Sequence, residues 1–464
     1  MPQKTGIHFE VSERKVLLRV FDLLAVFIAL YGISYSFEFD YFKITKVYWF
    51  WSLILSLYLT IFGTIFELYN LKQSSKLDTT FKNIVLTVSV TVLFYLLTPI
   101  ITPTLPNQRI QIIYFYLAIV GSIFLWRIAY TTFISSPRFY KRVLVLGEIS
   151  NVENIVKTFS TSDPNYKIVG FINSDSAHDD SIKFTGLKEY KQEELQSVIK
   201  KEWISEIVIA INDSDNITPQ IYNELTILLE QGFTIREYTQ VFEEVTKRVP
   251  VQFVGKDFYK YFPFSRSNQN KLYMFYHRGM DIICSAIGIL CGIILLPLVI
   301  IGNLIGNRGS LFYTQKRIGK HGKPFTIIKL RTMIENAEKG GVKWADKNDS
   351  RVTSFGRFLR NTRLDEIPQF INVLKGEMSI IGPRPERPFF VNELSKIIPF
   401  YETRHTVKPG LSGWAQVNSR YGSSIEDSLI KLQYDLFYIK HRSFFLDINI
   451  IVKTLNTMIY YRGQ

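Results

Sequence analysis

The stretch NTRLDEIPQFINVLKGEMSIIGPRPERP, residues 361–388, is the part around which the rest of the chain is organised. Two adjacent carboxylates, Asp365 and Glu366, follow the basic residue Arg363. An apolar helical stripe comes next, and a proline-locked basic turn, Gly-Pro-Arg-Pro at 382–385, closes the stretch. Acids can act as nucleophiles or hold a divalent cation, and arginines can bind phosphate oxygens through two hydrogen bonds. The stretch therefore suits phosphoryl chemistry.

Adjacent acids also occur elsewhere in the chain, and most such pairs are solvated surface. The other pairs are Asp179-Asp180, Glu193-Glu194, Glu243-Glu244 and Glu426-Asp427. The pair at 365–366 differs because a basic, proline-locked segment lies beside it, whereas the others lie in polar or loop-like sequence. On the residues alone, a catalytic pair and a solvated pair both stay open.

Composition indicates a membrane protein. The chain has 464 residues, enough for two or three domains, with a net charge of +14 and 15% aromatic residues. Its mean hydropathy is +0.08, which is high for a basic soluble protein. Cationic residues collect on the cytoplasmic side of membrane proteins and meet anionic lipid there. No nucleic-acid-binding motif is evident, so nucleic acid is not an expected partner.

Four apolar segments occupy the first third of the chain, at 16–34, 47–66, 81–101 and 110–134. Each is long enough to cross about 30 Å of hydrocarbon. Buried helices of a soluble protein are the alternative, but four runs with short polar gaps favour a four-helix transmembrane bundle in residues 1–136. Lys and Arg gather before the first segment, between the second and third, and after the fourth. This bias places the N-terminus and the exit of the fourth segment in the cytoplasm.

Residues 137–249 have the pattern of a small α/β domain. Helix-like stretches alternate with apolar strands, which predicts a parallel, Rossmann-like sheet. The strands are expected at 143–147, 167–172, 206–211 and 234–238, and helices at 192–201 and 218–231. The turn at 148–151, Glu-Ile-Ser-Asn, lacks the G-x-G-x-x-G fingerprint that lets a pyrophosphate approach the backbone. A scaffold for packing or assembly is therefore favoured over a nucleotide or regulatory site.

A linker or hairpin is expected at 250–270, followed by a fifth apolar run at 282–305. Hydropathy alone predicts a fifth membrane span. However, basic residues flank the run on both sides, which places both of its ends in the cytoplasm. Pro297 removes a backbone donor and clashes with the carbonyl of Ile293, so a bend is expected there. The run is therefore predicted to be a re-entrant membrane helix.

The segment 308–331 contains seven Lys or Arg and no acid, and its alternation predicts a strand pair or a strand leading into a helix. It suits a lipid-facing surface or a diphosphate site. The aromatic, basic region 429–461 predicts amphipathic helices on the membrane, with core helices as the alternative. Cys284 and Cys291 are too far apart along one helix to pair, and the six histidines show no metal-ligand spacing.

Four ordered blocks resemble the bacterial sugar transferases, the polyprenyl-phosphate hexose-1-phosphate transferases. They are TQKRIGKHGKPFTIIKLRTM at 314–333, DSRVTSFGRFLR at 349–360, the stretch at 361–388, and VKPGLSGWAQVN at 407–418. The resemblance covers residues 271–464 and implies a mainly helical catalytic domain there. The layout is similar to that of the long members, which initiate exopolysaccharide, capsule or O-antigen synthesis.

The resemblance implies transfer of a sugar-1-phosphate from a UDP-sugar to polyprenyl (undecaprenyl) phosphate, with release of UMP. Asp365 would be the nucleophile that carries the phosphosugar, and Glu366 would hold Mg²⁺. The residues implied to hold phosphate oxygens are Lys329, Arg331, Arg351 and Arg384. The prolines implied to shape the site are Pro297, Pro383 and Pro385. One departure is Leu296, where many members have a serine before the proline.

The resemblance also implies a multi-pass protein of the bacterial inner membrane with a cytoplasmic catalytic domain. The expected partners are the UDP-sugar, polyprenyl phosphate and the lipid bilayer, and a homodimer stays open. Two other functions stay open as well: a membrane glycosyltransferase that releases UDP, and a non-enzymatic membrane sensor whose α/β domain binds a nucleotide.

Overall fold

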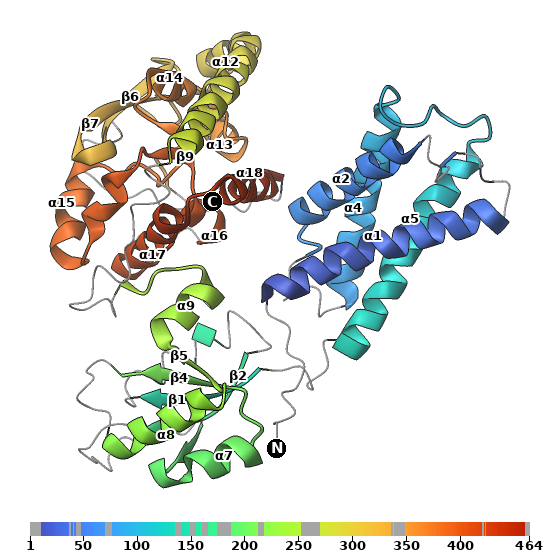
Figure 1. Cartoon of the computed structure of the whole chain (residues 1–464). Helices are drawn as coiled ribbons and strands as arrows, with labels where there is room; N and C mark the ends of the chain where they lie inside the picture. The colour runs from blue at the N-terminus through green and yellow to red at the C-terminus, as the bar shows by residue number, and fades with distance from the viewer. Residues whose placement is uncertain are drawn as a thin grey trace. The chain divides into compact units, whose positions relative to one another are not determined.

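A computed structural model describes residues 11–36, 39, 41–42, 48–69, 77–134, 141–147, 152, 155–156, 158–159, 166–173, 187–211, 218–251, 270–335, 337, 349–419, 422 and 424–459. This part of the chain is mostly helical (Figure 1). The chain divides into two compact units, Met1–Thr246 and Lys247–Gln464. The first unit contains the apolar N-terminal helices and a parallel sheet, and the second contains the stretch at 361–388.

The four predicted N-terminal segments are all helical. They form α1 (Val11–Ser36), α2 (Trp49–Ile65), α4 (Leu77–Leu97) and α5 (Ile110–Ala129), and α5 continues into a π-helical turn, η1 (Tyr130–Ile134). Of these, α1, α4 and α5 are long and apolar enough to cross a membrane. The 17 residues of α2 make it shorter than the predicted 47–66, and a span ordinarily needs about 20. Its helix ends before Glu67, whose φ is +57°.

Inward-facing apolar side chains hold the four helices together, among them Leu18, Leu55, Ile84 and Ile119. One buried ion pair joins α1 to α5: Arg127 donates to Asp22 at 2.7 Å. Charges within apolar helices are tolerated where they pair with each other inside a bundle.

The predicted parallel sheet is confirmed. Its strands are β1 (Lys141–Gly147), β2 (Tyr166–Asn173), β3 (Lys188–Tyr190), β4 (Glu206–Ala210) and β5 (Thr234–Glu237). Their order is β3-β2-β1-β4-β5, and every neighbouring pair is parallel. A short helical turn η3 (Gln192–Glu194) leads into α7 (Leu195–Lys201), and α8 (Pro219–Glu230) and α9 (Tyr238–Thr246) follow. Apolar residues of α7 and α8 form the core with Leu144, Leu146 and Ile207.

The second unit begins with α12 (Lys271–Gly306), which carries a long exposed apolar face. An antiparallel hairpin, β6 (Phe312–Ile318) and β7 (Pro324–Leu330), follows, as one of the two sequence alternatives predicted. The remaining elements are η6 (Lys320–Gly322), α13 (Ser354–Asn361), η7 (Leu364–Glu366), α14 (Gln369–Lys375), β8 (Ser379–Ile381), α15 (Pro388–Ile397), η8 (Tyr401–Thr406), β9 (Gly410–Ser412), α16 (Trp414–Asn418), α17 (Ile425–His441) and α18 (Phe444–Ile459). Strands β8 and β9 are parallel.

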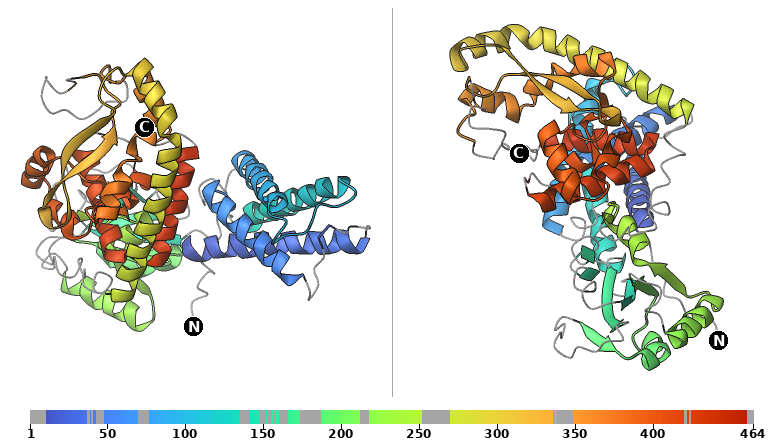
Figure 2. Two further views of the ribbon diagram at one scale, coloured as in Figure 1. Left: turned by 90° about the horizontal axis from the view of Figure 1, so that it is seen from above. Right: turned by 90° about the vertical axis from the view of Figure 1, so that its left-hand side faces the viewer.

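Helix α12 is continuous through Pro297 and curves along the second unit (Figure 2). Its glycines lie where other elements approach most closely. A Cβ at Gly288 would lie 2.4 Å from Phe370, and one at Gly292 would lie 2.6 Å from Ile367. Further along, Phe355 of α13 packs in the same way against Gly302 and Gly306. The helix therefore forms a platform for the elements on either side of Asp365.

The C-terminal region corrects one expectation. Helix α17 is not a surface helix on the membrane but part of the core, where Leu432, Leu436 and Tyr438 are buried. Its apolar residues face the rest of the unit on several sides, so the alternative of a core helix is right for α17. Val249 and Val251 pack into the same core. Most of the predicted linker, residues 252–269, lies outside the described part of the chain.

Candidate active site

Asp365 and Glu366 lie in a tight turn between two helices. Helix α13 ends at Asn361, and Arg363 then adopts a left-handed conformation with φ of +59°. This conformation reverses the chain into the single turn of η7, which is closed by hydrogen bonds from Glu366 N to Arg363 O and from Ile367 N to Leu364 O. Helix α14 follows at once. The local sequence thus places both carboxylates at the junction of two helices that pack on α12.

Glu366 is surrounded by cations from three parts of the chain. Its Oε1 accepts from Lys329 Nζ at 3.3 Å and from Arg384 Nη2 at 3.1 Å. Its Oε2 lies 3.7 Å from Arg363 Nη1. Burial opposes ionisation of this carboxyl, but Lys329, Arg384 and Arg363 outweigh it and lower the pKa of Glu366. Glu366 is therefore a permanent anion at neutral pH.

Asp365 has a different environment. It is 7% exposed, and within the described residues its carboxylate accepts no hydrogen bond and forms no ion pair. Burial and the neighbouring charge of Glu366 raise the pKa of Asp365 from 3.8 to about 6, against the opposing effect of Lys329, Arg360 and Arg363. A partly desolvated carboxylate without a partner can act as a nucleophile or as a metal ligand.

The predicted phosphate-binding residues fall into two groups. Lys329, near the end of β7, and Arg384, in the Gly-Pro-Arg-Pro turn, both contact Glu366. Burial lowers the pKa of Lys329, and the charge of Glu366 opposes that shift.

Arg331 and Arg351 contact other groups. Arg331 donates to Glu335 and to the carbonyl of Asn307, both at 3.2 Å. Arg351 binds Asp349 through Nε and Nη2 and the carbonyl of Ala337 through Nη1. The structure brings neither of them to Glu366.

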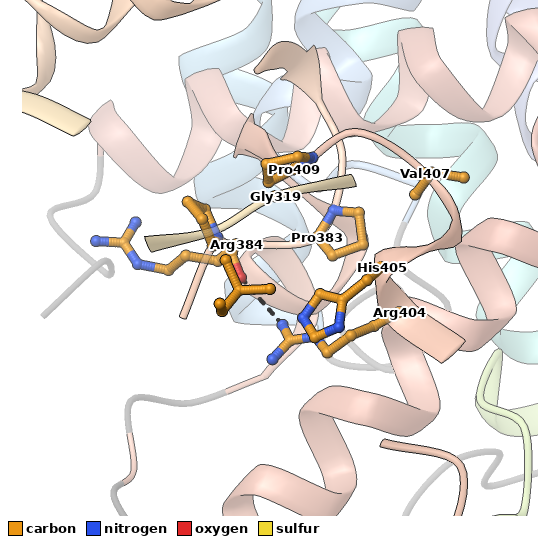
Figure 3. Close-up of a pocket in the computed structure, with 9 residues that line it drawn as sticks. Gly319, Pro383, Arg384, Arg404, His405, Val407 and Pro409 are labelled. Atoms are coloured by element: carbon orange, nitrogen blue, oxygen red, sulfur yellow. Dashed lines mark hydrogen bonds between the residues drawn. The ribbon is translucent and has the colours of Figure 1, made fainter. Parts of the chain in front are cut away.

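The Gly-Pro-Arg-Pro turn is fixed through its carbonyl groups. Pro383 O accepts from Gly410 N at 2.9 Å, and Pro385 O accepts from Arg317 Nη1 at 3.1 Å. Figure 3 shows the third contact, in which Arg404 donates to the carbonyl of Arg384 at 3.1 Å. These contacts hold the main chain on the side of the turn that lines a small pocket.

Arg404 was not among the residues predicted from sequence. It is buried, and it also donates to Tyr401 Oη and to Asp435 Oδ2. Its position in the ordinary polar stretch YETRHT gives no local signal for a role at the turn, because Arg384 and Asp435 lie 20 and 31 residues away. Pro297 lies within α12, and no hydrogen bond among the described residues connects it directly to Glu366.

The carboxylates of Asp365 and Glu366 fit a magnesium site in which a substrate supplies some of the ligands. Among the described residues, no group of three or more His, Cys, Asp or Glu side chains could hold a metal ion. Mg²⁺ on phosphate substrates is ordinarily held by one or two carboxylates together with phosphate oxygens and water. Glu366 and Asp365, whose oxygens accept no hydrogen bond from the part of the chain that the structure describes, supply that number of carboxylates. The arrangement as a whole can bind an anionic phosphate and attack it.

Comparison with known proteins gives a consistent result for the second unit. Residues 272–461 match the family model described as bacterial sugar transferase. Over 189 residues the chain is 44% identical to a UDP-N-acetylgalactosamine-undecaprenyl-phosphate N-acetylgalactosaminephosphotransferase of Aeromonas hydrophila, covering 40% of this chain and 44% of that protein. It is 45% identical over 159 residues to a UDP-glucose:undecaprenyl-phosphate glucose-1-phosphate transferase of Xanthomonas campestris pv. campestris, covering 34% and 33%.

A protein of Caulobacter vibrioides with the same description as the Xanthomonas one is 35% identical over 187 residues, which are 39% of this chain and 69% of that protein. The match to the first two relatives thus spans less than half of their length. The similarity is concentrated in the region that holds Asp365, Glu366 and the turn at 382–385.

Proposed function

The chain belongs to the bacterial sugar transferase family, and from this premise we propose that it transfers a sugar-1-phosphate from a UDP-sugar to undecaprenyl phosphate, releasing UMP. The relatives are described as transferases of this kind that act on undecaprenyl phosphate. The observation that carries the proposal is that Asp365, which has no hydrogen-bond or ion-pair partner among the described residues, lies beside a Glu366 held by Lys329, Arg384 and Arg363. A nucleophile and a cation-lined anion site then lie side by side.

The proposed reaction has two steps. An oxygen of the Asp365 carboxylate forms a bond to the phosphorus next to the sugar, the phosphoanhydride bond breaks, and UMP leaves with the electron pair. The phosphosugar stays on Asp365 as an acyl phosphate. The phosphate of the lipid then attacks the same phosphorus, which regenerates the carboxylate. Two anionic substrates never need to occupy the site together, so the kinetics are ping-pong.

The remaining side chains stabilise charge. Arg384 and Lys329 hold phosphate oxygens during the transfer, and the fixed turn keeps Arg384 in place. Mg²⁺ held by Glu366 would neutralise negative charge on the diphosphate of the UDP-sugar and on the departing UMP. Arg331 and Arg351 would need to leave their present partners to take part, so their assignment as phosphate ligands rests on the family resemblance alone.

The membrane placement belongs to the same proposal. We assign α12 as a re-entrant helix, the sheet as a Rossmann-like domain, and the second unit to the cytoplasmic side of the bacterial inner membrane. The exposed apolar face of α12 supports insertion into lipid. Both ends of α12 bind the same compact unit, through Asp281 to Ser379 at one end and through Asn307 to Arg331 at the other.

Product identity tests the proposed function. The purified full chain in lipid nanodiscs, supplied with UDP-sugars and undecaprenyl phosphate, is expected to release UMP and to leave a lipid-linked sugar diphosphate. UMP should also appear in an amount equal to the enzyme when the lipid phosphate is omitted. The Asp365→Asn variant should release none. Release of UDP would point to a glycosyltransferase that passes only the sugar, and turnover by Asp365→Asn would exclude the covalent step.

A further inference from the structure

Asn372 is a buried polar residue that the proposed chemistry does not use. It lies in the middle of α14 and is 1% exposed. Its Oδ1 accepts from the main-chain N of Ile328 at 3.2 Å, and its Nδ2 donates to the carbonyl of Thr326 at 2.8 Å. Both partners are main-chain groups of β7. The side-chain amide therefore binds the strand as a neighbouring strand would.

The free edge of β7 explains this contact. In the described residues β7 pairs only with β6. Residues two apart along a strand direct their main-chain groups to the same side, so Thr326 and Ile328 present one acceptor and one donor on one edge. A carboxamide offers the complementary donor and acceptor. Asn372 thus satisfies the edge of β7 and fixes its position relative to α14.

A third hydrogen bond sets the orientation of the amide. Asn372 Nδ2 also donates to Glu377 Oε2 at 2.7 Å. An ionised carboxylate only accepts hydrogen bonds, so the nitrogen must face Glu377 and Thr326. The oxygen is then left for Ile328. The amide has one arrangement in which every contact is made.

The two elements joined by Asn372 carry the two sides of the site. Lys329 directly follows Ile328 in β7, and Glu366 lies three residues before Gln369, the first residue of α14. Their side chains meet at 3.3 Å. We propose that Asn372 is a positioning residue for the transfer reaction: it sets the place of Lys329 relative to Glu366 and Asp365 without touching substrate. This inference rests on the proposed function.

Packing alone would hold α14 near β7 but would not fix this register. Val373, the next residue, packs with Ile327 of β7 and with Met378. Apolar contacts are non-directional and tolerate small shifts. The position of a catalytic ammonium group does not tolerate such shifts, because a displacement of about 1 Å can lower a rate about 100-fold. Asn372 supplies the directional contacts that the apolar cluster lacks.

A double-mutant cycle tests the inference in the full chain in nanodiscs. The variants are Asn372→Leu, Lys329→Met and the double variant, and the readout is the rate of UMP release. Asn372→Leu should lower kcat by about 10- to 100-fold in the native background. In the Lys329→Met background, Asn372→Leu should lower kcat less than about threefold, because the effects of substituting residues that act together are not additive. Equal losses in both backgrounds would overturn the inference and leave Asn372 a purely structural role.

Two controls keep the result interpretable. Asn418→Ala removes a side chain that also makes two hydrogen bonds, to Trp414 and Lys453, on elements that hold none of the site residues. It should lower the unfolding temperature but leave kcat unchanged. If Asn372→Leu does not fold, Asn372→Asp, which keeps the acceptor for Ile328 but cannot donate to Thr326, takes its place in the cycle.

A second readout separates this inference from the proposed function. The rate at which an amine-reactive reagent modifies Lys329, relative to Lys431, should rise in Asn372→Leu because the ammonium group moves off Glu366. An unchanged relative rate would contradict the positioning role even in a chain that shows no transferase activity. Turnover by Asp365→Asn, in contrast, would defeat the proposed function and leave the labelling result standing.

Discussion

The pKa values of Asp365 and Glu366 shift in opposite directions although the two residues are neighbours. Burial, reinforced by the charge of Glu366, raises the pKa of Asp365 to about 6. For Glu366, three cations outweigh the same burial and lower the pKa. Environments that push the pKa values of two carboxyl groups apart commonly separate their roles. Asp365 is the more basic of the pair and therefore the better nucleophile, whereas Glu366 stays ionised and suits a metal or structural role.

This difference predicts a pH dependence for the first half-reaction. In the proposed mechanism only ionised Asp365 attacks phosphorus, so the rate of UMP release should be flat above about pH 7 and fall about tenfold per unit below pH 6. The first half-reaction is the right measurement, since the lipid phosphate of the second step itself titrates near pH 6. Rapid-quench measurement of UMP without lipid phosphate gives the profile. A rate unchanged between pH 7 and pH 5 would contradict the assignment.

The sequence accounts for only part of the site at this scale. Arg363, Glu366 and Arg384 lie in one stretch, so the motif itself suggested their proximity. From the sequence, Lys329 and Arg331 were both predicted to hold phosphate oxygens. In the structure Lys329 contacts Glu366 and Arg331 does not. Arg331 follows the end of β7 and turns toward Asn307. That difference depends on where the hairpin ends, which no local pattern specifies.

The glycines of α12 have a packing role that the sequence did not reveal. Pro297 alone led to the expectation of a bend in this run, and α12 is continuous. Gly288 and Gly292 face Phe370 and Ile367, which flank the start of α14. Spaced four residues apart, they lie on one face of the helix. Their lack of a side chain allows the turn that carries Asp365 to approach the helix closely.

Substitution of one of these glycines should therefore impair activity. Gly288→Ala introduces a Cβ 2.4 Å from Phe370, and such overpacking costs about 1–3 kcal/mol. We expect a lower unfolding temperature and reduced UMP release. Gly279→Ala is the matched control, because Gly279 lies on the same helix and no atom of the described residues lies within 4 Å of the new Cβ. It should be neutral or stabilising by about 0.5–1 kcal/mol. Equal behaviour of the two variants would exclude the packing role.

Elements with long, regular patterns were predictable, and short ones were not. The apolar runs of β1, β2 and β4 match the expected strands closely, and α8 begins one residue after the expected start at 218. Strand β3 has three residues, of which only Tyr190 is buried, so it carries no periodic signal. Helix α13 was not predicted either, because eight residues span barely two turns.

In the chain as a whole, the second compact unit begins before the first residue that the family model matches. That match starts at residue 272, yet Lys247–Val251 already belongs to the second unit. Trp414 Nε1 donates to the carbonyl of Lys247 at 3.1 Å, and Val249 N donates to Gln433 O at 3.1 Å. Val249 and Val251 are buried in the core. The segment anchors the start of the unit.

Two fragments test this anchor. A fragment starting at Lys247 contains Asp365, Glu366 and their cationic partners and should keep transferase activity in detergent. A fragment starting at Asn268 should also be active but less stable by about 3 kcal/mol or more, because it loses two buried valines. Thermal unfolding of both gives the difference. A folded but inactive fragment from Lys247 would show that the upstream region contributes to catalysis.

The proposed path of α12 in the membrane determines how the second unit would reach the proposed substrates. The helix is long enough to cross, and its outer face is apolar. Yet its first half binds β8 through Asp281, and its last turns bind Phe355 of α13 and, through Asn307, Arg331. A crossing would carry α13, with its arginines, through hydrocarbon that charged side chains avoid. A re-entrant path keeps these elements and Asp365 at headgroup level on one side.

Cysteine labelling on intact cells distinguishes the two paths. In a chain with Cys284 and Cys291 replaced by Ser, the exposed positions Lys271 and Ser310 are changed singly to Cys and treated with a membrane-impermeant reagent. A re-entrant helix leaves both unlabelled until the membrane is opened, because both ends of α12 then face the cytoplasm. Leu105→Cys, between α4 and α5, should label from outside and shows that the reagent reaches the far side. Labelling of Ser310→Cys from outside would mean a true span. It would also separate Asp365 from the cytoplasm, where nucleotide sugars are made. That outcome would therefore contradict both the re-entrant topology and the proposed reaction.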